Sequence, residues 1–87
     1  MVERTVTIRN ELGMHARPAA QFVRLASTFG ARVEIERDGM AVNGKSIMGV
    51  MMLAAECGCE LTLRAEGDDA EAAVTALGEL VDRGFGE

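Results

Sequence analysis

Apolar and polar side chains alternate along four short segments of this chain, with the period of two that is typical of half-buried β-strands. The four segments are residues 2–9, 32–36, 40–42 and 60–65. The pair Asp38-Gly39 separates the second segment from the third and is a strong signal for a tight turn. The pattern therefore predicts four strands, of which the middle two form a hairpin.

The segment from about 16 to 29 has apolar residues at helical spacing, namely Ala19, Phe22, Val23, Ala26 and Phe29. Pro18 lies in its first turn, where proline is favoured because the first backbone N–H groups have no intrahelical partner. Gly30 fits the C-terminal cap. These features predict a helix over 16–29.

Two further helices are indicated later in the chain. Ser46 is well placed to cap a short helix over 47–53. Asp68, with Glu71 three residues later, resembles a capping box at the start of a longer helix that Gly84 ends. The apolar face of this last helix consists of Ala70, Ala73, Val74, Leu77, Leu80 and Val81.

The order of these elements predicts an α+β fold. We expect an open-faced β-sandwich in which a four-stranded antiparallel sheet carries three helices on one face and water on the other. With 87 residues and 9.3 kDa the chain has room for one core, so residues 1–87 are predicted to form a single domain. Only 3% of the residues are aromatic, which favours an aliphatic core and a surface site over an enclosed pocket.

The formal charge of −5 is unevenly distributed. Residues 1–45 hold seven Lys/Arg and five Asp/Glu, a charge of +2, whereas residues 46–87 hold two and nine, a charge of −7. Four cations are expected around the single histidine: Arg9, Arg17, Arg24 and Lys45. Such a patch could attract an acidic protein. Nucleic-acid binding is not expected, because the chain is acidic and lacks both a dense basic run and stacking aromatics.

Other classes of site find little support. Cys57 and Cys59 are too close together for an easy disulfide and lack further ligands for a metal, so we interpret them as reduced thiols in a loop. No metal or cofactor is expected. The chain has no signal-peptide pattern and no apolar run near the roughly 20 residues that span a bilayer, which predicts a soluble, cytoplasmic protein without membrane insertion.

His15 is the strongest candidate for chemistry. It is the only histidine, and it precedes a predicted helix N-terminus, where free N–H groups and the positive end of the helix dipole favour an anion. Arg17 adds a forked cation suited to phosphate. A lone histidine is more often a structural or merely exposed residue, but these neighbours favour a nucleophile that receives a phosphoryl group.

Two segments carry a resemblance to a known family. Residues 13–19, Gly-Met-His-Ala-Arg-Pro-Ala, and residues 42–51, Val-Asn-Gly-Lys-Ser-Ile-Met-Gly-Val-Met, are similar to the two signature segments of the HPr family. HPr is the histidine-containing phosphocarrier of the bacterial phosphoenolpyruvate-dependent phosphotransferase system. The similarity extends over the whole chain.

The resemblance implies a role for several residues. His15 would accept a phosphoryl group on Nδ1 from Enzyme I and pass it to a sugar-specific acceptor subunit. The backbone N–H groups of Ala16 and Arg17 would hold the phosphate oxygens, and the Arg17 side chain would stabilise the charge. Ser46 matches a position that a dedicated serine kinase phosphorylates in some members. The protein would be a carrier and a substrate of enzymes, not an autonomous catalyst, and we expect a monomer.

The resemblance also implies a face for protein partners, formed by Ala20, Arg24, Ile47, Met48 and Met51. The short helix over 47–53 has more apolar side chains than it can bury. The simplest alternative is that all of them face the sheet. We expect a split instead, with some side chains buried and Ile47, Met48 and Met51 at least partly exposed.

Two alternatives remain open. The first is a nitrogen-branch regulatory phosphocarrier. Leu12 stands where many HPr proteins have a hydroxyl residue, and an apolar residue at this position resembles the nitrogen-branch proteins. Ser27 and Gly49 stand where some members have lysine, which makes the basic surface thinner. The second alternative is a non-catalytic module that binds a regulator through its helical surface.

Overall fold

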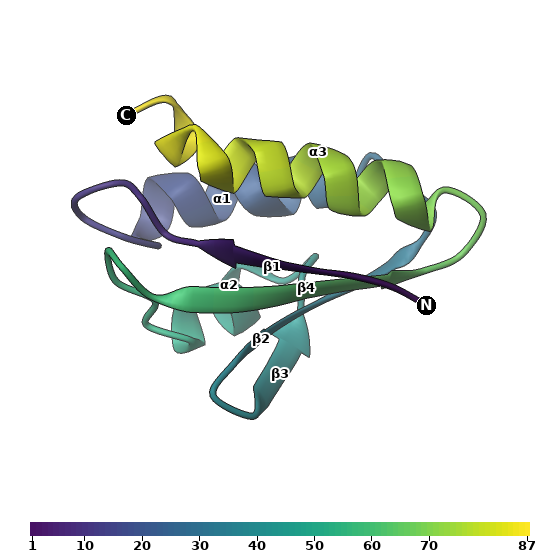
Figure 1. The fold of residues 1–87 in the computed structure, drawn as a ribbon, viewed down its shortest axis with the longest axis horizontal. Helices are drawn as coiled ribbons and strands as arrows, with labels where there is room; N and C mark the ends of the chain where they lie inside the picture. The colour runs from purple at the N-terminus through teal and green to yellow at the C-terminus, as the bar shows by residue number, and fades with distance from the viewer.

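A four-stranded antiparallel sheet forms the base of the molecule in the computed structural model, which describes residues 1–87 (Figure 1). Its strands are β1 (Val2–Thr7), β2 (Arg32–Arg37), β3 (Met40–Asn43) and β4 (Glu60–Glu66), in the order β1-β4-β2-β3. The register places Val6 opposite Leu61, and Ile35 opposite Leu63, so the apolar positions of neighbouring strands share one face. The predicted four strands and the hairpin are confirmed.

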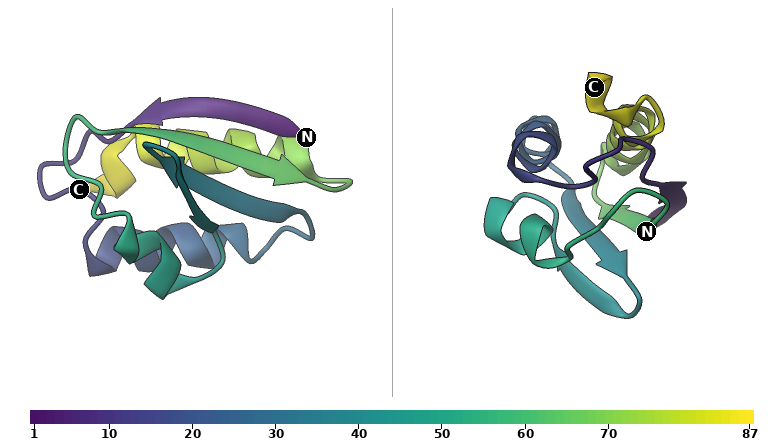
Figure 2. Two further views of the ribbon diagram at one scale, coloured as in Figure 1. Left: turned by 90° about the horizontal axis from the view of Figure 1, so that it is seen from below. Right: turned by 90° about the vertical axis from the view of Figure 1, so that its left-hand side faces the viewer.

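Three α-helices cover that apolar face, and the opposite face is open (Figure 2). They are α1 (Ala16–Ala26), α2 (Ile47–Met52) and α3 (Ala70–Asp82), and a short 3-10 helix, η1 (Gly84–Gly86), follows α3. All six residues of the predicted apolar face of α3 are buried, and the largest fully buried side chain is Phe22 of α1. The α+β open-faced sandwich is thus confirmed. No helix has the length and apolar character needed to cross a membrane.

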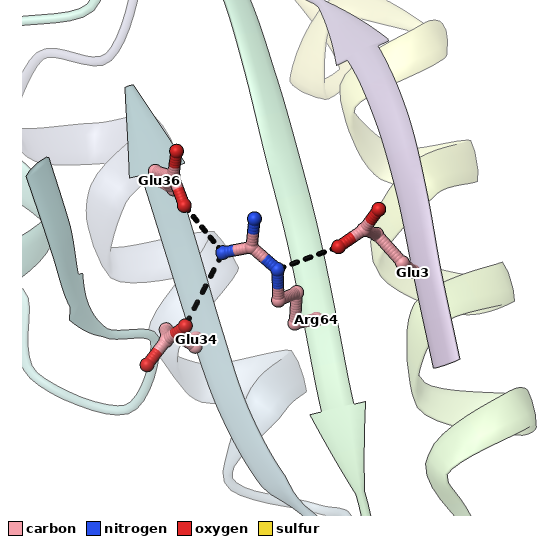
Figure 3. Close-up of polar contacts among 4 residues, drawn as sticks. All are labelled: Glu3, Glu34, Glu36 and Arg64. Atoms are coloured by element: carbon pink, nitrogen blue, oxygen red, sulfur yellow. Dashed lines mark hydrogen bonds and ion pairs between the residues drawn. The ribbon is translucent and has the colours of Figure 1, made fainter. Parts of the chain in front are cut away.

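The open face of the sheet is polar and holds an ion-pair cluster centred on Arg64 (Figure 3). The Arg64 guanidinium donates to Glu3 on β1 at 2.6 Å and to Glu34 and Glu36 on β2, so one cation connects three adjacent strands. The hydrogen bond to Glu36, followed by that to Glu3, raises the pKa of Arg64 above its ordinary value. The charges of these four residues therefore serve to link neighbouring strands through ion pairs.

The first helix is shorter than the sequence predicts. It ends at Ala26, because the N–H groups of Thr28 and Phe29 bond to carbonyls three residues back and the Thr28 hydroxyl also donates to Leu25 O at 2.7 Å. Gly30 does not have the left-handed conformation of a helix cap. Its assignment as the cap is therefore wrong.

The predicted capping box at residues 68 and 71 is also wrong. The N-cap of α3 is Asp69, and its side chain makes no bond to its own helix. The carboxylate instead accepts the N–H groups of Gly30 at 2.9 Å and Ala31 at 2.8 Å. The bond from Gly30 is the main reason that the pKa of Asp69 is lowered. Asp69 thus joins the start of α3 to the connection between α1 and β2.

Other local predictions are confirmed. Asp38 and Gly39 both have positive φ, of 50° and 86°, as a tight hairpin turn requires. The Ser46 hydroxyl accepts the N–H of Gly49 at 3.1 Å and so caps α2. Gly84 follows the end of α3 with a φ of 62°.

Candidate functional site

His15 is the N-cap residue of α1, and its backbone is extended, with φ −78° and ψ −174°. Its carbonyl accepts the N–H of Ala19 at 3.0 Å, which closes the first turn of the helix. The N–H groups of Ala16 and Arg17 have no hydrogen-bond partner within the protein, and Pro18 has no N–H. The imidazole therefore stands beside two free backbone donors at the positive end of an 11-residue helix.

Gly13 holds the loop that carries His15 against the loop before β4. Its φ is 69°, and a Cβ atom at this position would lie only 2.4 Å from Ala55 O. The next residue, Met14, is buried and donates its N–H to the same carbonyl oxygen at 2.7 Å. A glycine is thus needed here both for the left-handed conformation and for the close approach of two backbones.

The His15 side chain has a carboxylate partner that the sequence did not reveal. Its Nε2 atom lies 2.9 Å from Oε2 of Glu87. The other oxygen of Glu87 accepts from Nδ2 of Asn10 at 3.1 Å, and the same Nδ2 donates to Gly13 O at 2.7 Å. Asn10 is only 5% exposed. The hydrogen bond from Asn10 is the main cause of the lowered pKa of Glu87, with smaller contributions from His15 and Arg17.

The segment after α3 brings Glu87 to this position. Phe85 is buried in the core, and Gly84, Phe85 and Gly86 all have positive φ, so the chain turns sharply after α3. Figure 1 shows the C-terminal end beside the loop that precedes α1. His15 and Glu87 are 72 positions apart, and no periodicity or motif in the sequence connects them.

The predicted basic patch is smaller than expected. Arg9, Arg17 and Arg24 are exposed, and Arg17 is close enough to Glu87 to lower the pKa of its carboxyl group. Lys45, in contrast, donates to the carbonyl of Phe29, beyond the C-terminal end of α1. Eleven residues of helix at about 1.5 Å each separate that carbonyl from His15. The placement of Lys45 around His15 is therefore wrong.

The split predicted for the short helix is confirmed. Ile47 is 44% exposed, Met48 73% and Met51 40%, and Val50 is the one buried residue of α2. Met52 is also exposed, so the buried share of α2 is smaller than the predicted split implies. Because α2 packs against α1, its apolar side chains lie beside the helix that His15 caps (Figure 2). Ala20, on α1, is half-buried.

The cysteines take no part in this arrangement. Both thiols are free, Cys57 is exposed and Cys59 is half-buried. The Cys57 thiol contacts the carbonyl of Arg9 at 3.8 Å. No three His, Cys, Asp or Glu side chains are grouped so that they could hold a metal ion. The chemistry available at the site is therefore that of an imidazole, an arginine, a carboxylate and free N–H groups.

Comparison with known proteins gives one consistent family. The family model for the "PTS HPr component phosphorylation site" matches residues 2–83. Phosphocarrier protein HPr of Treponema pallidum (strain Nichols) is 49% identical over 87 residues, which are 100% of this chain and 99% of the relative. The HPr-like protein Crh of Bacillus subtilis (strain 168) is 47% identical over 81 residues, 93% of this chain and 95% of that protein.

Solved structures agree with this result. The crystal structure of HPr-C-His from Thermoanaerobacter tengcongensis matches with a TM-score of 0.96 and 49% identity, over 100% of this chain and 98% of that one. A crystal structure described as an HPr dimer from the same organism matches with a TM-score of 0.80 and 49% identity, over 100% of both chains. The chain belongs to the HPr family, the phosphocarrier proteins of the phosphotransferase system.

Proposed function

We propose that the chain accepts a phosphoryl group on Nδ1 of His15 from phosphorylated Enzyme I and passes it to sugar-specific acceptor subunits. One observation carries this proposal. His15 caps α1 beside the free N–H groups of Ala16 and Arg17, and its Nε2 atom is hydrogen-bonded to the carboxylate of Glu87. A nucleophile and donors for the phosphate oxygens thus lie together in this chain. Its membership of a family of phosphocarriers supports the same function.

The transfer proposed at this site is a displacement between two imidazoles. The lone pair on Nδ1 of His15 attacks the phosphorus, the bond between phosphorus and the donor nitrogen breaks, and its electron pair returns to the donor ring. The Ala16 and Arg17 N–H groups would hold the oxygens of the arriving group. The helix dipole stabilises an exposed anion by on the order of 0.3–1 kcal/mol. The Arg17 guanidinium would add a full positive charge beside the phosphoryl group.

Docking would use the surface that α1 and α2 share. The exposed side chains Ile47, Met48 and Met51 of α2 would supply apolar contact, and the half-buried Ala20 of α1 would add to it. The exposed guanidiniums of Arg17 and Arg24 would attract an acidic partner and make the association sensitive to salt. Docking and phosphoryl transfer would both be carried out by a single, monomeric carrier domain over residues 1–87 in the cytoplasm.

Ser46 would be a site of control. Its hydroxyl caps α2 and is half-buried, so the first role of the residue is structural. A phosphate group on it, placed by a serine kinase and removed by a phosphatase, would carry close to two negative charges next to Ile47 and Met48. These charges would weaken docking of an acidic partner and slow phosphoryl uptake by His15.

The test is incubation with Enzyme I and phosphoenolpyruvate that carries a labelled phosphoryl group. We expect one acid-labile label per chain, none in His15→Ala, and slower uptake in Arg17→Ala. The matched control is Arg32→Ala, because Arg32 is also exposed but begins β2, after the C-terminal end of α1, whereas His15 caps the N-terminal end. Undiminished labelling of His15→Ala would overturn the assignment. Addition of acceptor subunits should then remove the label from the wild-type protein.

The second candidate is a regulatory interaction module. The similarity to Crh of Bacillus subtilis, whose solution structure is described as that of the catabolite repression HPr, favours it, together with the exposed apolar surface of α2. A nitrogen-branch carrier would be a regulator that still uses His15. A module without carrier activity would take no label from any Enzyme I of its host, so the same labelling reaction separates the two classes.

A further inference from the structure

Glu87 makes the only side-chain hydrogen bond of the His15 imidazole, and that bond involves the nitrogen that does not attack in the proposed reaction. A carboxylate can only accept a hydrogen bond, so an Nε2 atom 2.9 Å from it must carry the proton. The neutral ring then has its lone pair on Nδ1. The contact therefore selects one tautomer of His15.

Glu87 is itself held in place from the protein interior. Asn10 is buried, and its Nδ2 donates both to Glu87 and to the carbonyl of Gly13, the residue two before His15. The Gly13 carbonyl and the Glu87 carboxylate can only accept hydrogen bonds, so the NH₂ group of the Asn10 amide must face them. This requirement fixes the orientation of the Asn10 side chain. On the other side, the buried Phe85 anchors the segment that carries Glu87. The carboxylate is thus positioned by two elements far apart in the sequence.

We propose that Glu87 is a positioning residue that keeps His15 as the Nε2–H tautomer and balances the charge of the ring once Nδ1 is phosphorylated. The charge-balancing role rests on the proposed function, whereas the selection of the tautomer does not. When Nδ1 forms its bond to phosphorus and Nε2 keeps its proton, the imidazole becomes a cation. Glu87, already ionised and bonded to Nε2, lies where that positive charge appears.

Two variants separate these roles. Glu87→Gln keeps an oxygen that can accept the Nε2 proton but loses the charge, whereas Glu87→Ala loses both. The matched control is Glu11→Ala, which removes a carboxylate from the exposed loop before His15 that has no bonded partner in the structure. None of these side chains belongs to the core, so the fold should persist in all three variants.

The first measurement is the tautomer ratio of His15 from the ¹⁵N chemical shifts of its ring, at about pH 9, where imidazole is neutral. We expect Glu87→Ala to lower the ratio of Nε2–H to Nδ1–H about tenfold, a change that corresponds to the loss of one charge-assisted hydrogen bond. Glu87→Gln should lower it much less, and Glu11→Ala should leave it unchanged. This measurement needs neither Enzyme I nor phosphate.

The second measurement is phosphoryl exchange with Enzyme I. Both Glu87 variants should reach a severalfold lower ratio of phosphorylated to free chain at equilibrium than the wild-type protein and Glu11→Ala. A wild-type protein that takes no label would refute the proposed carrier function and, with it, the charge-balancing role. A tautomer ratio that stays the same in Glu87→Ala would refute the positioning role of Glu87, whether or not His15 is labelled.

Discussion

Replacement of Gly13 by alanine would place a methyl group against the backbone of the loop before β4. The added Cβ would lie 2.4 Å from Ala55 O and 2.7 Å from the Cα atom of Glu56, both closer than non-bonded atoms approach. Neither neighbour is the end of a flexible side chain, so the two loops must separate. Because His15 follows Gly13 by two residues, this separation would displace the candidate site.

The cost of the substitution has two parts. An L-residue in the left-handed region, at the φ of 69° that Gly13 has, costs about 1–2 kcal/mol. Separation of the loops also breaks the 2.7 Å hydrogen bond from Met14 N–H to Ala55 O, which contributes about 1 kcal/mol, and loosens the packing of the buried Met14. We expect Gly13→Ala to lower the free energy of unfolding by about 3 kcal/mol.

Gly39→Ala is the matched control for this experiment. Gly39 also has a positive φ, of 86°, but a Cβ there would meet no atom within 4 Å. Its substitution should cost only the conformational part, about 1–2 kcal/mol. Urea denaturation of the two variants and the wild-type protein gives the comparison. Gly13→Ala should also slow phosphoryl uptake by the folded protein, whereas Gly39→Ala should not.

Equal losses of stability in the two variants would refute the reasoning, because the close approach of the loops would then contribute nothing. Normal uptake by a destabilised Gly13→Ala protein would show that the position of this loop does not control the chemistry of His15.

Three further predictions concern other parts of the structure. Ser46→Ala should lose about 1 kcal/mol of stability with its helix cap, whereas Ser46→Asp should keep the cap yet take up phosphate more slowly at low salt; equal uptake rates in the two variants would leave Ser46 as a cap alone. Met48→Asp should weaken transfer from Enzyme I with little change in stability, since Met48 is 73% exposed, and a variant that unfolds would place this residue in the core. The pKa of Asp69 is lowered in the folded chain, so its stabilisation is present above about pH 4 and is lost as the pH falls through the folded pKa; urea titrations should therefore show a weaker decline of stability in acid for Asp69→Asn than for the wild-type protein.

The strands and much of the site could be predicted because their causes are local in the sequence. Alternation sets the face of each strand residue, and Asp38-Gly39 supplies the two positive φ angles of its turn. Ser46 caps the helix that follows it directly. The exposure of Met48 could also be predicted, because a helix of six residues cannot bury apolar side chains on every side.

The early end of α1 has a local cause in the bonds of Thr28 and Phe29, but the other errors and omissions concern contacts between distant segments. The capping box predicted at Asp68 fails because Asp69 is the N-cap of α3, and its carboxylate accepts the N–H groups of Gly30 and Ala31 instead of those of its own helix. Lys45 lies away from His15 because its ammonium group donates to the carbonyl of Phe29, beyond the C-terminal end of α1. Glu87 meets His15 only through the turn after α3. Such contacts depend on how elements pack together, which periodicity and spacing do not encode.

The most direct test of the central claim is to identify the phosphorylated atom. A ¹⁵N-labelled sample, phosphorylated by Enzyme I and phosphoenolpyruvate, can be examined by ¹⁵N and ³¹P NMR under alkaline conditions that preserve phosphohistidine. The site geometry predicts one phosphoryl group, bonded to Nδ1 of His15, with Nε2 facing Glu87. Phosphorylation of Nε2, or of any residue other than His15, would contradict the account.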